Sequence, residues 1–233
     1  MAQIEAVPSR AMDLAVTTIV VSPFAQNCRI VVDKKTGDAV IVDPGDDAKR
    51  ILAAVRASGA TVRHLLATHG HLDHVGAVKP LQDALGVPFA IDAADRPLLE
   101  MLPEHGLAFG MRGLRTPSID LDLADVSEIP FGSGVIRIVH TPGHTPGGST
   151  FLFGERGTKG LFGDSLFHLS VGRTDLGGDA DVYSRTIRDV ILPMPDEMEV
   201  HSGHGPSSTM AVERRDNPYL NGEVDIGCPD LPL

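Results

Sequence analysis

The densest group of potential metal ligands lies in residues 68–74, which read Thr-His-Gly-His-Leu-Asp-His. Neutral imidazoles and carboxylates are ligands that zinc and related first-row metals prefer. His69 and His71 are two residues apart, so an extended backbone points both side chains to one side. Asp73 and His74 fall where the chain turns into a predicted helix, so they can approach from another direction. This segment could therefore supply ligands to two adjacent metal ions rather than one.

The alternative for this segment is a polar turn whose histidines only cap the following helix. Capping a helix requires one side-chain acceptor at its start, and three histidines are not what such a turn needs. We therefore interpret the segment as a metal site.

Three more polar side chains lie in turns that could bring them to the same place. His144 lies within the turn 141–147, Asp164 follows a predicted strand, and His204 lies just past another. Each is flanked by Gly or Pro, which lets the backbone turn sharply and aim one side chain inward. Each of these residues alone is more typical of a solvated turn, so they support a metal site only in combination with the first cluster.

The other histidines have no comparable spacing; they are His64, His105, His140, His168 and His201. We expect His140 and His201 to be strand residues or outer hydrogen-bond partners of ligands, because metal-bound imidazoles need such partners. We expect His105 and His168 to lie in surface loops.

Short strands and helices must position these residues. Runs rich in β-branched residues predict strands at 17–21, 28–32, 39–42, 64–67, 87–91, 135–139, 148–153, 160–162 and from residue 200. Apolar residues at helical spacing predict helices over 47–58, 75–85 and 181–191. Residues 101–127 hold three glycines and two prolines and predict a long surface excursion. Both halves run from β pairs to a helix, which favours a layered α/β sandwich.

Composition limits the class of protein. The 233 residues fit one domain over 1–233, with a loose lead-in at 1–15 and a surface tail at 216–233. The net charge of −11 without a basic stripe argues against nucleic-acid binding. Two cysteines cannot build a disulfide framework, and Cys28, in a predicted strand, is expected in the core rather than as a nucleophile. No charged-then-apolar leader and no membrane-length apolar run is visible, so we expect a cytoplasmic protein that binds no membrane.

The order of these motifs resembles the metallo-β-lactamase superfamily, and within it the compact glyoxalase II-like (hydroxyacylglutathione hydrolase-like) branch. Beside the histidine cluster, the chain carries the family's Asp-Pro-Gly at 43–45, Gly-Asp-Ser-Leu-Phe at 163–167 and Gly-Arg-Thr-Asp at 172–175. It also carries Gly-His-Gly-Pro at 203–206 and a late Glu213 followed by Asn217-Pro218. The resemblance covers about residues 17–220.

The resemblance implies a four-layer αββα sandwich with a loop-built site at one edge. One metal would take His69, His71 and His144; the other would take Asp73, His74 and His204; Asp164 would bridge them. The ions, zinc above all with iron or manganese as options, would share a bridging hydroxide that attacks a thioester carbonyl. Asp73 would orient that hydroxide.

The substrate that the resemblance implies is a small molecule, a hydroxyacylglutathione such as S-lactoylglutathione. Longer glyoxalase II proteins continue into a helical domain that helps bind glutathione, and this chain lacks it. Arg173 matches a basic residue that contacts a glutathione carboxylate in those relatives. A purely structural Arg173, paired with Asp175 or Asp179, is equally compatible with the sequence. The oligomeric state is left open.

Three alternatives stay open at this stage. Persulfide dioxygenases also resemble the chain and would hold one iron by His69, His144 and Asp164. A lactonase or another hydrolase on the same fold is compatible because a fold does not dictate its substrate. A non-catalytic metal-binding domain would need a broken ligand set, and this set is intact.

Overall fold

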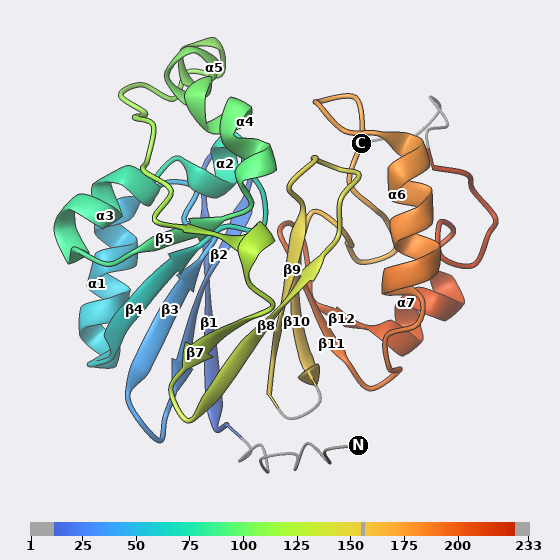
Figure 1. The fold of residues 1–233 in the computed structure, drawn as a ribbon, viewed down its shortest axis with the longest axis horizontal. Coiled ribbons are helices and arrows are strands. Elements are labelled where there is room, and N and C mark those ends of the chain that lie inside the picture. The colour runs from blue at the N-terminus through green and yellow to red at the C-terminus, as the bar shows by residue number, and fades with distance from the viewer. Residues whose placement is uncertain (1–11, 155–156, 227–233) are drawn as a thin grey trace, which may run out of the picture.

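The computed structural model describes residues 12–154 and 157–226, and these form the four layers that Figure 1 shows. Two six-stranded sheets lie face to face, and helices cover the outer face of each. The α/β sandwich expected from the sequence is confirmed. Of the lead-in expected at 1–15, residues 1–11 lie outside the described part, and so does Cys228.

The first sheet comes from the first half of the chain. Its strands, in sheet order, are β1 (Leu14–Val21), β2 (Gln26–Asp33), β3 (Asp38–Val42), β4 (Thr61–Leu66), β5 (Phe89–Ile91) and β6 (Leu121–Asp122). The pairs β1/β2 and β2/β3 are antiparallel, and the pairs from β3 to β6 are parallel. Between the strands lie α1 (Ala48–Ser58), α2 (Leu72–Val75), α3 (Val78–Leu85), α4 (Arg96–Glu100), α5 (Leu102–Ala108) and the short 3-10 turns η1 (Ala93–Asp95) and η2 (Leu123–Asp125).

The second sheet comes from the second half. Its strands, in sheet order, are β7 (Glu128–Phe131), β8 (Gly134–His140), β9 (Ser149–Phe153), β10 (Lys159–Gly163), β11 (Glu199–Ser202) and β12 (Ser208–Thr209). All neighbours are antiparallel except β10 and β11, which are parallel. Its outer face carries α6 (Ala180–Thr186), the π-helical turn η4 (Ile187–Ile191) and α7 (Met210–Asp216).

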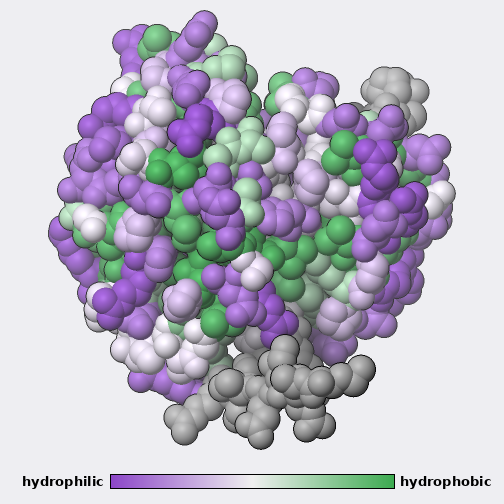
Figure 2. Space-filling model, viewed as in Figure 1, coloured by the Kyte–Doolittle hydropathy of each residue, from purple (hydrophilic) through white to green (hydrophobic). Residues whose placement is uncertain are grey.

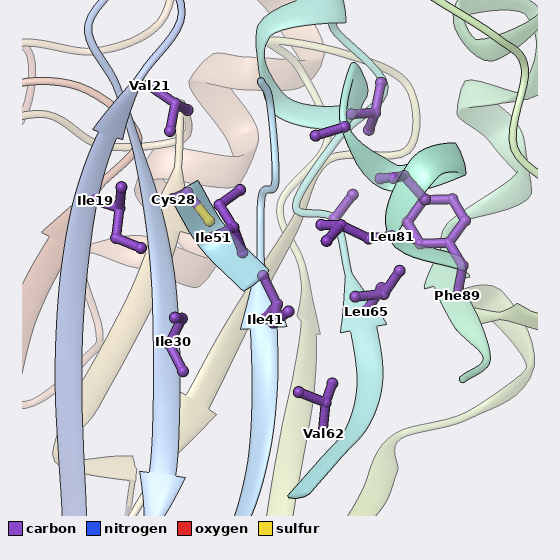
Figure 3. Packing of buried hydrophobic residues seen from close by; sticks show 14 of the residues in the cluster. Ile19, Val21, Cys28, Ile30, Ile41, Ile51, Val62, Leu65, Leu81 and Phe89 are labelled. Atoms are coloured by element: carbon purple, nitrogen blue, oxygen red, sulfur yellow. The ribbon is translucent and has the colours of Figure 1, made fainter. Parts of the chain in front are cut away.

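Strand alternation builds the core between these layers, because successive side chains on a strand point to opposite faces. On β3, Ala39 and Ile41 pack toward α1 and α3, whereas Val40 and Val42 pack between the sheets. Figure 3 shows the first of these clusters, with Cys28 among its side chains. Cys28 is fully buried, as a core residue should be, and burial raises its pKa far above the ordinary thiol value. In Figure 2 hydrophobic residues gather along the middle of the face shown, between hydrophilic flanks.

The region 101–127 is only partly the irregular surface excursion that was predicted, since residues 109–120 are irregular and mostly exposed but the flanking residues are ordered into short elements. It contains α5, β6 and η2, and α4 lies just before it. Pro103 sits in the first turn of α5, where a missing backbone N–H costs nothing. Gly106 lies inside the helix, where only glycine fits because an added Cβ would come within 2.6 Å of the Met111 carbonyl oxygen. Gly and Pro therefore serve helix start and helix packing here.

Other boundaries also shift. The helix predicted over 75–85 is α3 preceded by the separate short α2, and the helix predicted over 181–191 is α6 followed by η4. The surface tail expected from residue 216 is packed over its first residues, since Asn217, Tyr219 and Leu220 are buried. None of the described helices is both long and apolar enough to cross a bilayer.

Candidate metal centre

The ends of five elements meet at one edge of the sandwich and carry the seven residues singled out from the sequence. His69 and His71 follow β4, and Asp73 and His74 lie in the first turns of α2. His144 lies in the turn between β8 and β9. Asp164 follows β10, and His204 follows β11. Because β10 and β11 are parallel, their carboxyl ends bring Asp164 and His204 to the same edge.

The structure brings all seven side chains into contact distance. Three groups each hold candidate ligand atoms within 4.8 Å of one another: His69 with His71 and His144; His69 with His74 and Asp164; and Asp73 with His74 and His204. Asp164 links the first and last groups, with Oδ2 3.5 Å from His144 Nε2 and Oδ1 3.3 Å from His74 Nε2. This is the position that a bridging carboxylate would need.

In each of the five imidazoles, the ring nitrogen that points away from this centre lies next to an oxygen atom. His71 Nε2 lies 3.1 Å from the Leu176 carbonyl oxygen, His144 Nδ1 lies 2.6 Å from that of Arg173, and His204 Nδ1 lies 3.0 Å from that of Phe24. A carbonyl oxygen only accepts, so these outer nitrogens carry the proton. In the neutral form of each ring, the inner nitrogen therefore carries the lone pair that a metal would accept.

The other two imidazoles are held by polar side chains. His69 Nδ1 lies 3.1 Å from Thr68 Oγ1, and His74 Nδ1 lies 3.1 Å from Asp43 Oδ2 without hydrogen-bond geometry. Asp43 also accepts hydrogen bonds from the Thr68 amide and hydroxyl at 2.7 and 2.8 Å. The strand-end Asp-Pro-Gly motif therefore supports the histidine segment from behind.

The inner nitrogens are arranged as a cation requires. His71 Nδ1 and His144 Nε2 lie 3.0 Å apart, and in the neutral form that binds a metal each ring that donates its outer N–H has a lone pair on this inner nitrogen. His69 Nε2 and Asp164 Oδ1 are buried without any hydrogen-bond partner. Buried polar atoms of this kind are costly unless something satisfies them. The donor set of imidazoles and carboxylates fits metal ions, so the residues present fit the group that they are expected to hold.

The charges of the site are strongly coupled. Burial works to raise the pKa of Asp164, but the imidazoles of His74, His144 and His204 hold it well below its usual range. Burial works to lower the pKa of His74, but Asp164, Asp43 and Asp73 hold it well above its usual value. A proton on His74 thus supplies part of the positive charge that these carboxylates need without a metal.

The two remaining buried imidazoles behave in the opposite way. Burial lowers the pKa of His144 to about 4, and burial with the neighbouring imidazoles holds the pKa of His69 well below its ordinary value. Both rings are therefore neutral at neutral pH, which is the protonation state that binds a metal.

The remaining sequence candidates have other partners. Arg173 pairs with both carboxylate oxygens of Asp175, and Asp179 instead caps α6. His140, the last residue of β8, has its Nδ1 3.3 Å from Asp92 Oδ2. His201, on β11, pairs with Glu199 of the same strand. Both are strand residues, as expected, and they pair with these carboxylates, with His201 also 3.1 Å from the Ser207 hydroxyl.

Of the two histidines expected in surface loops, only one lies in a loop. His105 lies in α5 rather than in a loop. His168 does lie in a loop, where its Nδ1 is 3.2 Å from the buried carboxylate of Glu213. Glu213 also accepts hydrogen bonds from the Leu169 backbone amide and the Asn217 side-chain amide. The motif of Glu213 and Asn217-Pro218 therefore holds the loop that follows Asp164.

Sequence reasoning missed some supporting groups. The carbonyl oxygens of Phe24, Arg173 and Leu176 carry no side-chain signature, so spacing could not reveal them. Asp95 is fully buried beside the first metal group, yet its segment has no distinctive pattern.

Comparison with known proteins agrees with this geometry. A family model described as the metallo-beta-lactamase superfamily matches residues 21–204. The hydroxyacylglutathione hydrolase GloC of Haemophilus influenzae is 38% identical over 213 residues, covering 88% of this chain and 97% of the relative. The solved structure of the BLEG-1 B3 metallo-beta-lactamase is 32% identical with a TM-score of 0.82, covering 89% of this chain and all of that one. TTHA1623, solved in a di-iron-bound form, is 34% identical with a TM-score of 0.78, covering 88% and 100%.

Proposed function

The chain belongs to the metallo-beta-lactamase superfamily, and from this premise we propose that it is a dinuclear metal hydrolase that cleaves hydroxyacylglutathione thioesters such as S-lactoylglutathione. The coarser statement, a hydrolase of this fold whose His and Asp groups imply metal ions, rests on the family match and the site. The observation that carries the finer proposal is the intact set of seven donors around one centre.

Two ions are supported by the way the donors divide. His69, His71 and His144 form one group, and Asp73, His74 and His204 form another that a single-iron site would leave unused. This second group favours a dinuclear hydrolase over the mononuclear persulfide dioxygenase. Zinc suits this mixture of imidazoles and carboxylates, and TTHA1623 shows that a related chain binds two irons. When bound, the ions would supply an acidified water and a Lewis acid for the carbonyl oxygen.

The chain's own residues would then orient the reaction. Asp73 Oδ2 lies 3.2 Å from His204 Nε2, and both side chains are partly exposed, so this part of the site is open to a substrate. Asp73 would accept a hydrogen bond from the attacking water and direct its lone pair at the thioester carbon. The new C–O bond forms as the attacking water loses its protons to solvent, and the C–S bond breaks with its electron pair going to sulfur, so the products are a carboxylate and a thiolate. The thiol product has an ordinary pKa near 8.5, so it can leave as a thiolate without a strong general acid.

Arg173 is the proposed contact for a substrate carboxylate. Its guanidinium is about half exposed, and its carbonyl oxygen holds His144, so the side chain projects from a backbone fixed beside the metal centre. Exchange of Asp175 for a substrate carboxylate would replace one ion pair by another. Exposed ion pairs contribute only about 0–1 kcal/mol, so this exchange is inexpensive.

The test combines metal content with two assays on the purified full-length chain. We expect about two metal ions per chain and release of free glutathione from S-lactoylglutathione. Thioester cleavage should require the metals and return when they are restored. Oxygen consumption with glutathione persulfide, together with one iron per chain and no thiol release, would replace the proposal by the dioxygenase.

A further inference from the structure

Asp95 joins the two loops that carry the three-histidine group. It ends η1, enters α4, and is fully buried. Its Oδ2 accepts hydrogen bonds from the Gly70 amide and the Thr145 hydroxyl, both at 2.8 Å, and its Oδ1 accepts one from the Gly147 amide at 2.7 Å. Gly70 stands between His69 and His71, and Thr145 follows His144. One carboxylate therefore contacts both loops beside their candidate ligands.

The two glycines let the backbone approach this carboxylate closely. A Cβ added at Gly70 would lie 3.0 Å from Asp95 Cβ, and one added at Gly147 would lie 2.8 Å from Asp95 Cγ. Neither glycine has a positive φ, so packing rather than backbone conformation explains them. The glycine inside the His-Gly-His motif is thus matched to Asp95, which comes from a different segment of the chain.

We propose that Asp95 is a positioning residue for the metal group of His69, His71 and His144. Its three hydrogen bonds set the separation of the two loops, and this separation sets the 3.0 Å approach of His71 Nδ1 to His144 Nε2. Its carboxylate also places an acceptor-only group beside the two loops that carry these three imidazoles. The group of Asp73, His74 and His204 is supported separately by Asp43. The inference rests on metal binding in the proposed function and not on the substrate.

Asp33 offers a matched control. It is also fully buried, and it accepts three hydrogen bonds, from the Lys35 amide at 3.0 Å and from the Ser133 amide and hydroxyl at 2.6 and 2.7 Å. A Cβ at Gly132 would meet it at 2.4 Å. It stands at the opposite end of β2 from Gln26, which bridges to His204, about 23 Å along the strand at ~3.3 Å per residue. Asp33→Asn therefore removes a similar cluster of bonds far from the metals.

The experiment measures metal affinity without substrate. Metal-free full-length protein and its Asp95→Asn and Asp33→Asn variants are titrated with Zn²⁺ against a competing chelator, which gives two successive dissociation constants. We expect Asp95→Asn to weaken one of them by about 10–100-fold, the usual effect of removing a partner that orients a ligand. Asp33→Asn should leave both constants as in the unchanged protein.

A second measurement assigns the weakened ion. In a His204→Ala background, where the group of Asp73 and His74 is incomplete, Co²⁺ binding reports mainly on the three-histidine group. Asp95→Asn should weaken that binding, and Asp33→Asn should not. Because Asp95→Asn could fail to fold, Thr145→Val and Thr145→Ser provide a milder pair. Only the first removes the hydroxyl donor to Asp95, so only the first should lower Zn²⁺ affinity.

Equal dissociation constants for the Asp95 and Asp33 variants, or for Thr145→Val and Thr145→Ser, would overturn this inference. A chain that binds two ions in the expected manner but cleaves no thioester would instead overturn the proposed substrate and leave the role of Asp95 standing.

Discussion

His71 Nδ1 and His144 Nε2 face each other at 3.0 Å although each ring donates its other N–H to a backbone carbonyl. In the neutral form that binds a metal, both inner nitrogens carry lone pairs that repel each other at this distance, and a bound cation would replace that repulsion by two bonds. The relationship gives the metal a role in stability as well as in chemistry.

Metal removal should therefore lower the melting temperature. At a free Zn²⁺ concentration one hundred times Kd, one site adds about 2.7 kcal/mol, which corresponds to about 5–11 °C for a chain of this size. Differential scanning calorimetry of metal-free and Zn²⁺-loaded protein measures the difference. His71→Ala should lose the part of the gain that comes from the three-histidine site, whereas His201→Ala, which removes a histidine paired with Glu199 on β11, should keep the whole gain. The same gain in both variants would contradict metal binding at His71.

Asp73→Asn should reduce kcat by about 10²–10⁴-fold, the usual contribution of a positioned acid or base. Asparagine keeps the size of the side chain but accepts less well than a carboxylate. Steady-state kinetics with S-lactoylglutathione measures the loss, and circular dichroism should show an unchanged fold. Asp83→Asn, at an exposed pair with Lys79 and Arg115, is the control and should leave kcat unchanged. Full activity of the Asp73 variant would remove its assigned role.

Asp175 competes with the substrate for Arg173, so substitutions at the two positions should act in opposite directions. Arg173→Ala should raise KM by up to about 5-fold, because an exposed ion pair with a substrate carboxylate contributes about 0–1 kcal/mol. Asp175→Asn should lower KM about 1.5- to 5-fold by freeing the guanidinium. Kinetics with S-lactoylglutathione and with a thioester lacking carboxylates separates recognition from general damage.

The pair of Arg188 and Asp189 provides the control for that experiment, because it has the same two-bond geometry on the exposed side of η4. Arg188→Ala should leave KM unchanged. If Arg173→Ala and Asp175→Asn both leave KM unchanged, their ion pair is structural only.

Asp33 should make stability depend on pH. Burial works to raise its pKa, but the Ser133 hydroxyl, the Ser133 amide and the Lys35 amide hold it below its usual 3.8. A folded-state pKa below the unfolded value contributes stability above pH 3.8, and that contribution is lost as pH falls through the folded pKa. Urea unfolding of metal-free protein should show the deficit of Asp33→Asn at its largest near neutral pH and shrinking in acid. Ser133→Ala should show the same trend with smaller size, and a deficit independent of pH would refute it.

Alternation and turn chemistry made most of the framework predictable. The strands over 28–32 and 39–42 lie within β2 and β3, because buried β-branched runs there are bounded by turn residues. Within the region 101–127, helix α5 was missed because Pro103 and Gly106 were interpreted as breaks, whereas residues 109–120 do form an irregular and mostly exposed segment. Sequence spacing does not show that a proline stands in the first turn of a helix or that a glycine has another backbone against it.

The same limit applies to the centre. The seven candidate donors could be chosen because imidazoles and carboxylates are distinctive and Gly or Pro flanks them. Their supporting acceptors could not be, because Leu176, Phe24 and Arg173 act through main-chain oxygens that every residue has. Asp95 acts through a side chain, but its partners lie 25 and 50 residues away along the chain.

Because the donors come from both sheets, they also constrain when during synthesis the chain can bind its metal ions. The first sheet supplies His69 to His74, but His144, Asp164 and His204 come from the second, and His204 follows His74 by 130 residues. A growing chain on the ribosome can hold an ion only loosely through its early histidines. Tight binding of both ions must wait until His204 has been synthesised and the two halves have closed on each other, so metal content can serve as a marker of a closed sandwich.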